Sequence, residues 1–324
     1  MRQSINRQRV DESSRMFSYE FDSIITDDSL TQEYRQIKTD ELDLHFYKSN
    51  RTKERETYVY RDLSYIQMHY ELSNGYTAYQ SKHESKAAVR TESGKCTTFY
   101  LPELDGYLYD PVCKNAVSFE IEITEKWLRS NLSESSKSSY EFLKRMSNKE
   151  IAVLGKGSYS ISPEMRQLIY EINTCPYTGL VRQLYVEGKV MLLLGLQLHQ
   201  IECGLNFIDK DGMAKSDLDR YYYLGEILTT EYSMKHSIEE LSLRIGINRT
   251  KLQSGFKQCF GLTIHEYLIE VRMNEAYRLL RDAPKGSYSV VDIATQVGYK
   301  HYNHFSFMFK KKFGVPPSAF MLFV

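Results

Sequence analysis

The sequence predicts an α+β protein, in which an antiparallel β-rich (cupin-like) domain is followed by helices and then by an all-α domain. Three observations lead to this prediction. Residues that favour β-strands alternate with polar residues in the first part of the chain, helical periodicity replaces this alternation after about residue 124, and a pair of short helices is repeated near the C-terminus. The 324 residues are enough for two domains with sizeable cores.

These changes of pattern divide the chain into four parts. Residues 1–38 are polar and mixed in charge, and no element is assigned to them with certainty. A β-rich regulatory domain with C-terminal helices is expected over 39–203, a linker rich in glycine and charge over 204–215, and a helical domain over 216–324.

The predicted strands lie between about residues 40 and 123. The segments LDLHFY, TYVYRDLSYIQMHYEL, TTFYL and VSFEIEI alternate with a period of two, and Ser-Asn-Gly at 73–75 and Leu-Asp-Gly at 104–106 break the pattern. From Thr124 the segments EKWLRSNL, SSYEFLKRM and PEMRQLIYEI are helical, and Cys175-Pro176 separates them from a long apolar helix over Val181–Ile201. That helix has more leucines than one buried stripe requires. The extra leucines could form a homodimer seam or could pack in the core of the same chain, and the sequence leaves both alternatives open.

Composition excludes several classes of protein. No apolar run approaches the roughly 18 residues of a membrane span, and the N-terminus lacks the apolar core of a secretory signal. Five cysteines, an odd number without CxxC pairs, indicate free thiols in a reducing cytoplasm. The net charge is zero, but thirteen Lys and Arg against seven Asp and Glu from Ser233 onward give that part +6. This excess of positive charge indicates that the C-terminal part binds an anionic partner.

The last ninety residues contain two copies of one helix-turn-helix unit. SIEELSLRIGINRTKLQSGFKQCFG begins at Ser237, and SVVDIATQVGYKHYNHFSFMFKKKFG begins at Ser289. Gly246 in the first copy matches Gly298 in the second, and each is a structural residue that permits the tight turn between two helices.

The second helix of each copy has an apolar stripe and a polar face. The stripes, Leu252/Phe256/Phe260 and Phe305/Phe309/Phe313, are expected to pack on the first helix of their own unit. The opposite faces have cations, amides and hydroxyls but no acidic residue. Cations meet phosphates while amides and hydroxyls read base edges, so this duplicated face indicates double-stranded DNA as the partner.

Residues 216–320 resemble the DNA-binding domain of the AraC/XylS family of bacterial transcription regulators. The resemblance depends on IEELSLRIGINRTKLQSGFKQCFG, on YLIEVRMNEAYRLL between the repeats, and on VVDIATQVGY with NHFSFMFKKKFGVPPSAF. It implies a seven-helix domain with two recognition helices joined by a helix over about Ile264–Arg281. It also implies a cytoplasmic regulator, associated with the nucleoid when bound, most often an activator with RNA polymerase as a partner.

The resemblance also implies roles for individual residues. Arg272 matches a characteristic arginine of the family, which we expect to form a structural ion pair with Asp292. Phe307 departs from a frequent arginine, and its ring could contact a thymine methyl group instead of a guanine. The implied base contacts are Thr250, Gln253, Ser254, Tyr302, Asn303 and Phe307. The implied phosphate contacts are Arg249, Lys251, Lys257, His304, Lys310 and Lys311.

The N-terminal part is similar to the sensory part of a subgroup whose known members respond to iron–siderophore complexes. The likeness lies in INTCPYTGLVRQLYVEGKVMLLLGLQL, and it implies a ferric siderophore as a candidate small-molecule effector. The residues that would bind an effector are not identified by the sequence.

Two other functions stay open. A DNA repair or modification enzyme would need a reactive cysteine, for which Cys96 and Cys113 are the candidates, and a ligand-independent regulator would need no effector. No GxGxxG, Walker loop or GxSxG elbow occurs, and the N-terminal histidines are scattered. The sequence therefore predicts no catalytic residue, no cofactor and no metal site.

Overall fold

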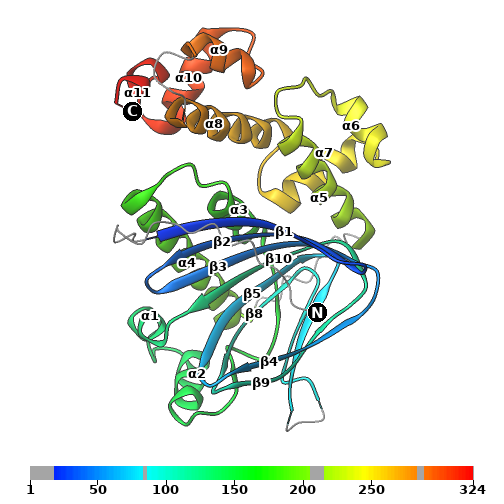
Figure 1. The fold of residues 1–324 in the computed structure, drawn as a ribbon, viewed down its shortest axis with the longest axis vertical. Coiled ribbons are helices and arrows are strands. Elements are labelled where there is room, and N and C mark those ends of the chain that lie inside the picture. The colour runs from blue at the N-terminus through cyan, green and yellow to red at the C-terminus, as the bar shows by residue number, and fades with distance from the viewer. Residues whose placement is uncertain (1–17, 83–85, 205–214, 283–287, 324) are drawn as a thin grey trace.

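The computed structural model describes residues 18–82, 86–204, 215–282 and 288–323 (Figure 1). Antiparallel sheets come first in this part of the chain and helices follow, so the predicted α+β class and order of elements are confirmed. The predicted linker, apart from its first and last residues, lies outside the described residues, as does most of the first half of the segment 1–38.

Two antiparallel sheets form the β-domain. The larger has the strand order β1-β2-β3-β10-β5-β8-β11, with β12 also paired to β8, and the smaller has the order β4-β9-β6-β7. The strands of the larger sheet are β1 (Ser18–Thr26), β2 (Leu30–Thr39), β3 (Leu42–Arg51), β5 (Tyr65–Ser73), β8 (Lys95–Leu101), β10 (Cys113–Ile123), β11 (Ala152–Val153) and β12 (Tyr159–Ser160). Those of the smaller sheet are β4 (Arg55–Arg61), β6 (Tyr76–Ser81), β7 (Val89–Glu92) and β9 (Leu104–Asp110).

The N-terminal segment contributes strands that the sequence did not indicate. β1 pairs with β2 from Ser18↔Thr39 to Thr26↔Thr31, and the Asp27 carboxylate closes the turn by accepting from the backbone N–H groups of Ser29 and Leu30. Residues 18–38 therefore extend the large sheet and are not a separate segment. Their charged residues hid the strand pattern because β1 lies at the sheet edge, where polar side chains are tolerated.

Strand β5 is buried on both of its faces. It lies between β10 and β8, with Met68, Tyr70 and Leu72 in the main core and His69 and Glu71 on the opposite face. Helices α1 to α4 complete that core with residues such as Trp127, Phe142, Ile169 and Leu193. One face of β5 therefore packs against the helices, and its other face points toward the smaller sheet.

Eleven helices occur in the described residues. In the β-domain they are α1 (Glu125–Asn131), α2 (Lys137–Ser147), α3 (Pro163–Asn173) and α4 (Gly179–Glu202). In the helical domain they are α5 (Lys215–Thr230), α6 (Ile238–Ile245), α7 (Arg249–Phe260), α8 (Ile264–Asp282), α9 (Val290–Gln296), α10 (Tyr302–Phe313) and α11 (Pro317–Phe323). The last group has the seven helices that the resemblance implies.

The helical domain has two cores joined by α8. Leu252, Phe256 and Phe260 belong to the first core, and Phe305 and Phe309 to the second. Phe313 is half-buried against the second core. The two predicted stripes therefore pack in their own units.

The two matching turn glycines differ in their surroundings. Gly246 and Gly298 both have left-handed backbones, with φ of +66° and +87°. A Cβ on Gly246 would meet open space, whereas one on Gly298 would lie 2.5 Å from the Ser233 carbonyl oxygen and 3.0 Å from Arg272 Nη2. The second turn thus needs glycine for space as well as for conformation.

We expect Gly298→Ala to lower the melting temperature of the helical domain more than the matched Gly246→Ala. Both variants incur about 1–2 kcal/mol of left-handed strain, but only Gly298→Ala must also displace the backbone at Ser233. Thermal unfolding followed by circular dichroism measures the difference. Equal shifts for the two variants would show that the close approach at Gly298 has no energetic effect.

Candidate nucleic-acid interface and its contact with the β-domain

Local caps fix the start of the first recognition helix. The side chain of Asn248 accepts a hydrogen bond of 2.9 Å from the Lys251 backbone N–H, and Ser237 caps α6 in the same way through Glu240 at 3.1 Å. Such caps satisfy backbone donors that a helix leaves free at its N-terminus. They fix where α6 and α7 begin, while burial of Leu252, Phe256 and Phe260 in the first core decides which side chains of α7 face outward.

The sequence-predicted base-contact residues lie on the outer faces of α7 and α10. Thr250, Gln253 and Ser254 are exposed on α7. On α10, Asn303 is exposed and Phe307 is 64% exposed, while Tyr302 is half-buried against the second core. Most of the Phe307 side chain is thus exposed and available to a partner.

The predicted phosphate-contact residues fall into two groups. Arg249 Nη1 lies 2.7 Å from Glu239 Oε1, and Lys251 Nζ lies 2.6 Å from the buried Asp217 carboxylate, so the charges of both cations are partly compensated. The other four are exposed, and no described carboxylate lies within salt-bridge distance of them: Lys257, His304, Lys310 and Lys311. The sequence did not indicate this division, because Asp217 lies 34 positions before Lys251.

The partner predicted for Arg272 is wrong. Its guanidinium donates hydrogen bonds to the backbone carbonyls of Tyr232 (2.7 Å) and Met234 (2.8 Å) and lies over the Tyr299 ring. Asp292 instead accepts hydrogen bonds from the N–H and hydroxyl of Ser289 in the capping box of α9. A carboxylate at the third position of a helix commonly accepts a hydrogen bond from the backbone N–H of the N-cap residue of the same helix.

The β-domain contacts the helical domain through α3, which lies against α7, through β5, which lies against α5, and through residues 170–176, which reach α8 (Figure 1). The rings of Tyr170 and Tyr267 lie 4.7 Å apart, and Asn274 Nδ2 donates to Thr174 Oγ1 at 3.3 Å. Arg281 Nη1 donates to the Pro176 carbonyl at 2.9 Å. We call these contacts, which involve residues 170–176 and α8, the α3–α8 contact. No local sequence pattern signals it, since its partners are about 100 positions apart.

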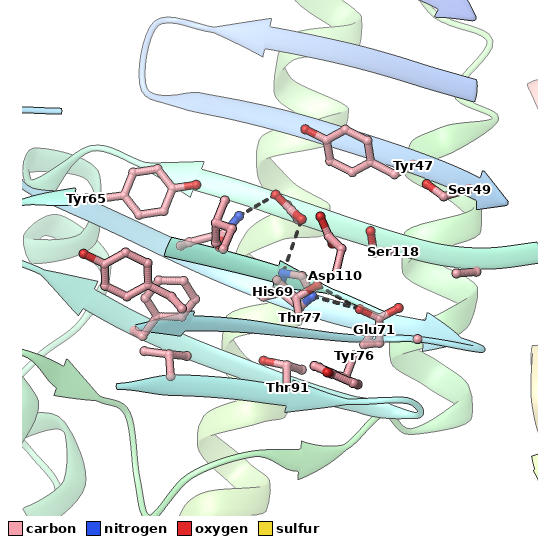
Figure 2. A pocket seen from close by; sticks show the side chains of 18 of the residues that line it. Tyr47, Ser49, Tyr65, His69, Glu71, Tyr76, Thr77, Thr91, Asp110 and Ser118 are labelled. Carbon is pink, nitrogen blue, oxygen red and sulfur yellow. Dashed lines mark hydrogen bonds and ion pairs between the residues drawn. The ribbon is translucent and has the colours of Figure 1, made fainter. Parts of the chain in front are cut away.

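A cavity of about 220 Å³ lies between the two sheets (Figure 2). His69 lies between two carboxylates, with Nε2 3.4 Å from Glu71 and Nδ1 3.4 Å from Glu120. Burial lowers the pKa of His69, but Glu71 and Glu120 together outweigh burial and hold that pKa above its ordinary value. Burial raises the pKa of Glu71. No sequence pattern indicated that these residues face a shared space.

The cysteines proposed for a reactive site are both buried. Burial raises the pKa of the Cys96 thiol to about 12, which opposes formation of the nucleophilic thiolate. Cys113 donates from its sulfur to the Ser49 carbonyl at 3.6 Å.

The described residues hold no group of three or more His, Cys, Asp or Glu side chains suited to a metal ion. No helix in the described part combines the length and apolarity needed to cross a bilayer.

Two family models match the chain. A helix-turn-helix domain matches residues 241–322, and the regulatory protein PchR N-terminal domain matches residues 55–206. The chain belongs to the AraC/XylS family. The family predicted from the duplicated helix-turn-helix is thereby confirmed, and the N-terminal match agrees with the likeness noted around Cys175-Pro176.

Several curated family relatives are similar to part of the chain. The regulatory protein PchR of Pseudomonas aeruginosa is 32% identical over 118 residues, which cover 36% of this chain and 40% of the relative. The Msm operon regulatory protein of Streptococcus mutans is 26% identical over 163 residues, covering 50% and 55%. The chain thus spans about half the length of the curated relatives it matches.

Solved structures of this family are also similar. The DNA-binding domain of AdpA, solved in complex with a target DNA, is 21% identical with a TM-score of 0.29, covering 32% of this chain and 90% of that one. An apo form of a ToxT variant from Vibrio cholerae is 12% identical with a TM-score of 0.34, covering 87% and 97%.

We expect Tyr170→Ala to loosen the α3–α8 contact. Loss of an aromatic pair removes about 0.5–1.5 kcal/mol, so amide protection in α8 should fall by roughly two- to tenfold in hydrogen–deuterium exchange. Tyr140→Ala is the control, because Tyr140 is exposed on α2 and its ring lies near Lys144 alone among the described cations. Unchanged protection in Tyr170→Ala would mean that the contact does not stabilise α8.

Proposed function

We propose that this chain is a sequence-specific DNA-binding transcription regulator that acts at the nucleoid in the bacterial cytoplasm. One observation carries the proposal: two copies of a helix-turn-helix unit each expose a recognition helix without a single acidic residue. A generic surface helix would mix charges of both signs, whereas a helix that enters a major groove faces phosphates on either side. Two such helices in one chain suit one face of the duplex.

Within this proposal, the exposed residues divide between base reading and phosphate binding. Gln253 has the amide geometry that pairs with adenine, and Phe307 offers an apolar surface to a thymine methyl group. Thr250, Ser254, Asn303 and the half-buried Tyr302 complete the base-reading set. Lys257, His304, Lys310 and Lys311 are the stronger phosphate candidates, since Arg249 and Lys251 already have carboxylate partners.

The same proposal includes control by a small molecule in the cavity of the β-domain. Glu71 faces that cavity, and the carbonyl of the next residue, Leu72, accepts a 3.3 Å hydrogen bond from Arg166 on α3. Because α3 also contacts α8, a ligand that shifts β5 shifts the helix that joins the two DNA-binding units. The family resemblance favours activation with RNA polymerase as partner, and it makes a ferric siderophore one effector class to test.

A homodimer formed through α4 is the third part of the proposal. Leu184 and Leu192 are 61% and 55% exposed, and a Cβ on Gly188 or Gly195 would meet nothing within 4 Å. With Val181, 59% exposed, these positions recur every three or four residues along one side of the helix. Small residues within an apolar stripe let a second helix approach closely.

Selection of genomic DNA fragments by the purified chain tests the regulator directly. Enrichment of a motif about two major grooves long would support it, and dependence of that enrichment on an added ferric siderophore mixture would support that effector class. Equal enrichment with and without ligands would favour a ligand-independent regulator. Failure to enrich any motif in all conditions would contradict DNA recognition by these helices.

We expect Gln253→Ala and Lys311→Ala to affect DNA binding in different ways. Gln253→Ala should cost about 1–3 kcal/mol at one base pair only. Lys311→Ala should weaken all sequences alike and reduce the slope of log affinity against log salt by about 0.9. Lys251→Ala is the matched control and should change the slope less, because Lys251 is paired with Asp217. Fluorescence anisotropy titrations at several salt concentrations measure all three, and identical behaviour would contradict the division of roles.

For the dimer, we expect Leu184→Glu to shift the chain toward the monomer, since a carboxylate in an apolar seam loses its hydration. Analytical ultracentrifugation over a concentration series measures the shift. Leu243→Glu makes the same change at a residue that is 83% exposed on α6, and it should leave the association unchanged. A wild-type monomer at all concentrations would contradict the seam.

A further inference from the structure

The cavity between the sheets has walls rich in aromatic rings. Strands β3, β5, β8 and β10 of the larger sheet and β6, β7 and β9 of the smaller one contribute to its lining. Four tyrosines and a phenylalanine are among the lining residues: Tyr47, Tyr65, Tyr76, Tyr79 and Phe99. Figure 2 shows Tyr47 and Tyr65 with Ser118, Asp110 and Glu71 around the same space. The π-faces of such rings attract cations.

The charged groups that line the cavity do not balance. Arg51 Nη2 and Asp110 Oδ1 lie 3.2 Å apart and form a neutral pair. Among the described residues that line the cavity, the remaining charged side chains are one imidazole, His69, and two carboxylates, Glu71 and Glu120. With both carboxylates ionised, even a fully protonated His69 leaves an excess of one negative charge among the described lining residues.

The excess charge lies where water screens it poorly. The side chains of His69, Glu71 and Glu120 are 2%, 4% and 19% exposed. Gln67 donates to Glu120 at 2.7 Å and Thr77 donates to Glu71 at 3.2 Å, but these neutral groups add no positive charge. A buried carboxylate without a counter-charge is unfavourable, so a bound cation would be stabilised here. Burial and then the charge of Glu120 raise the pKa of Tyr47, in agreement with a negative potential in the cavity.

We propose that this cavity binds a small organic cation, an amine or amidine on an aromatic body, whose charged group pairs with Glu120 and Glu71 and whose body packs against the tyrosine rings. This cation would be the effector in the control proposed above, and its role in regulation rests on that proposed function. The volume agrees with a small ligand, since about 220 Å³ is below the 300–1,000 Å³ typical of pockets for larger molecules. An anionic iron chelate would meet like charge and would have to separate the two sheets.

Charge-matched probes test the assignment on the full-length chain. 2-Phenylethylamine and benzamidine supply the cations, 2-phenylethanol the neutral body and phenylacetate the anion. Isothermal titration calorimetry should give at least one of the two cations a dissociation constant at least tenfold lower than that of the alcohol, as a charge-assisted hydrogen bond predicts. Phenylacetate should bind more weakly than either cation.

Two variants on β10 separate the cavity from general charge effects. Glu120→Gln should weaken binding of the cation at least tenfold and leave the alcohol unchanged. Glu122→Gln makes the same change two positions along the strand, where the side chain pairs with Arg61 outside this cavity, and should change neither. Glu71→Gln provides a second test at the cavity, and unchanged melting temperatures confirm that the variants fold.

Several results would overturn the assignment. They are failure of both cations to bind, equal or tighter binding of phenylacetate, full retention of cation binding in Glu120→Gln, and binding of an anionic ferric catecholate in place of the cations. DNA binding is measured on the same preparation without ligand. A chain that binds the cation but selects no DNA motif would contradict the proposed regulator and leave the cavity assignment standing. A chain that selects a DNA motif but does not bind the cation would contradict the cavity assignment and leave the proposed regulator standing.

Discussion

The position of helix α8 is the constraint on which the helical domain depends. Its first half contributes Tyr267, Leu268 and Val271 to the core of the first helix-turn-helix unit, and its second half contributes Met273, Ala276 and Leu280 to the core of the second. One continuous helix of 19 residues therefore fixes both units. At about 1.5 Å per residue it is about 28 Å long, close to the roughly 34 Å of one turn of DNA.

The same helix is one of three elements of the helical domain that contact the β-domain, together with α5 and α7. Arg166 near the start of α3 donates a hydrogen bond to the carbonyl of Leu72 on β5, while Tyr170 farther along α3 and Thr174, directly after it, contact α8. A displacement of β5 under the proposed effector control would reach α8 through this short helix. A closely packed interface of this kind changes between discrete arrangements and does not deform continuously. Under the proposed effector control, this series of contacts would be the route from a ligand beside Glu71 to α8.

The sequence predicted the parts of the fold that depend on local pattern. The duplicated unit, its two apolar stripes and the need for glycine at positions 246 and 298 all follow from residues within a few turns of one another. The partners of Arg272, the pairing of Lys251 with Asp217 and the α3–α8 contact join positions 34 to about 105 apart, and periodicity has no information on such distances. Strand β1 was missed for a related reason, because an edge strand is defined by its neighbour more than by its own alternation. The cavity needs two sheets to exist, so its residues could not be grouped in advance.

The ion pairs of the first recognition helix give the two units different electrostatic characters. Arg249 and Lys251 on α7 share their charge with Glu239 and Asp217, while Lys310 and Lys311 on α10 have no described carboxylate within salt-bridge distance. Under the proposed DNA binding, the attraction to phosphates, which does not depend on sequence, would be stronger at the second unit because more of its cations are unpaired with described carboxylates. The first unit, with less free charge, would then depend more on the proposed base contacts of Gln253 and its neighbours. A regulator built this way would be held on DNA mainly by α10 and would choose its site mainly through α7.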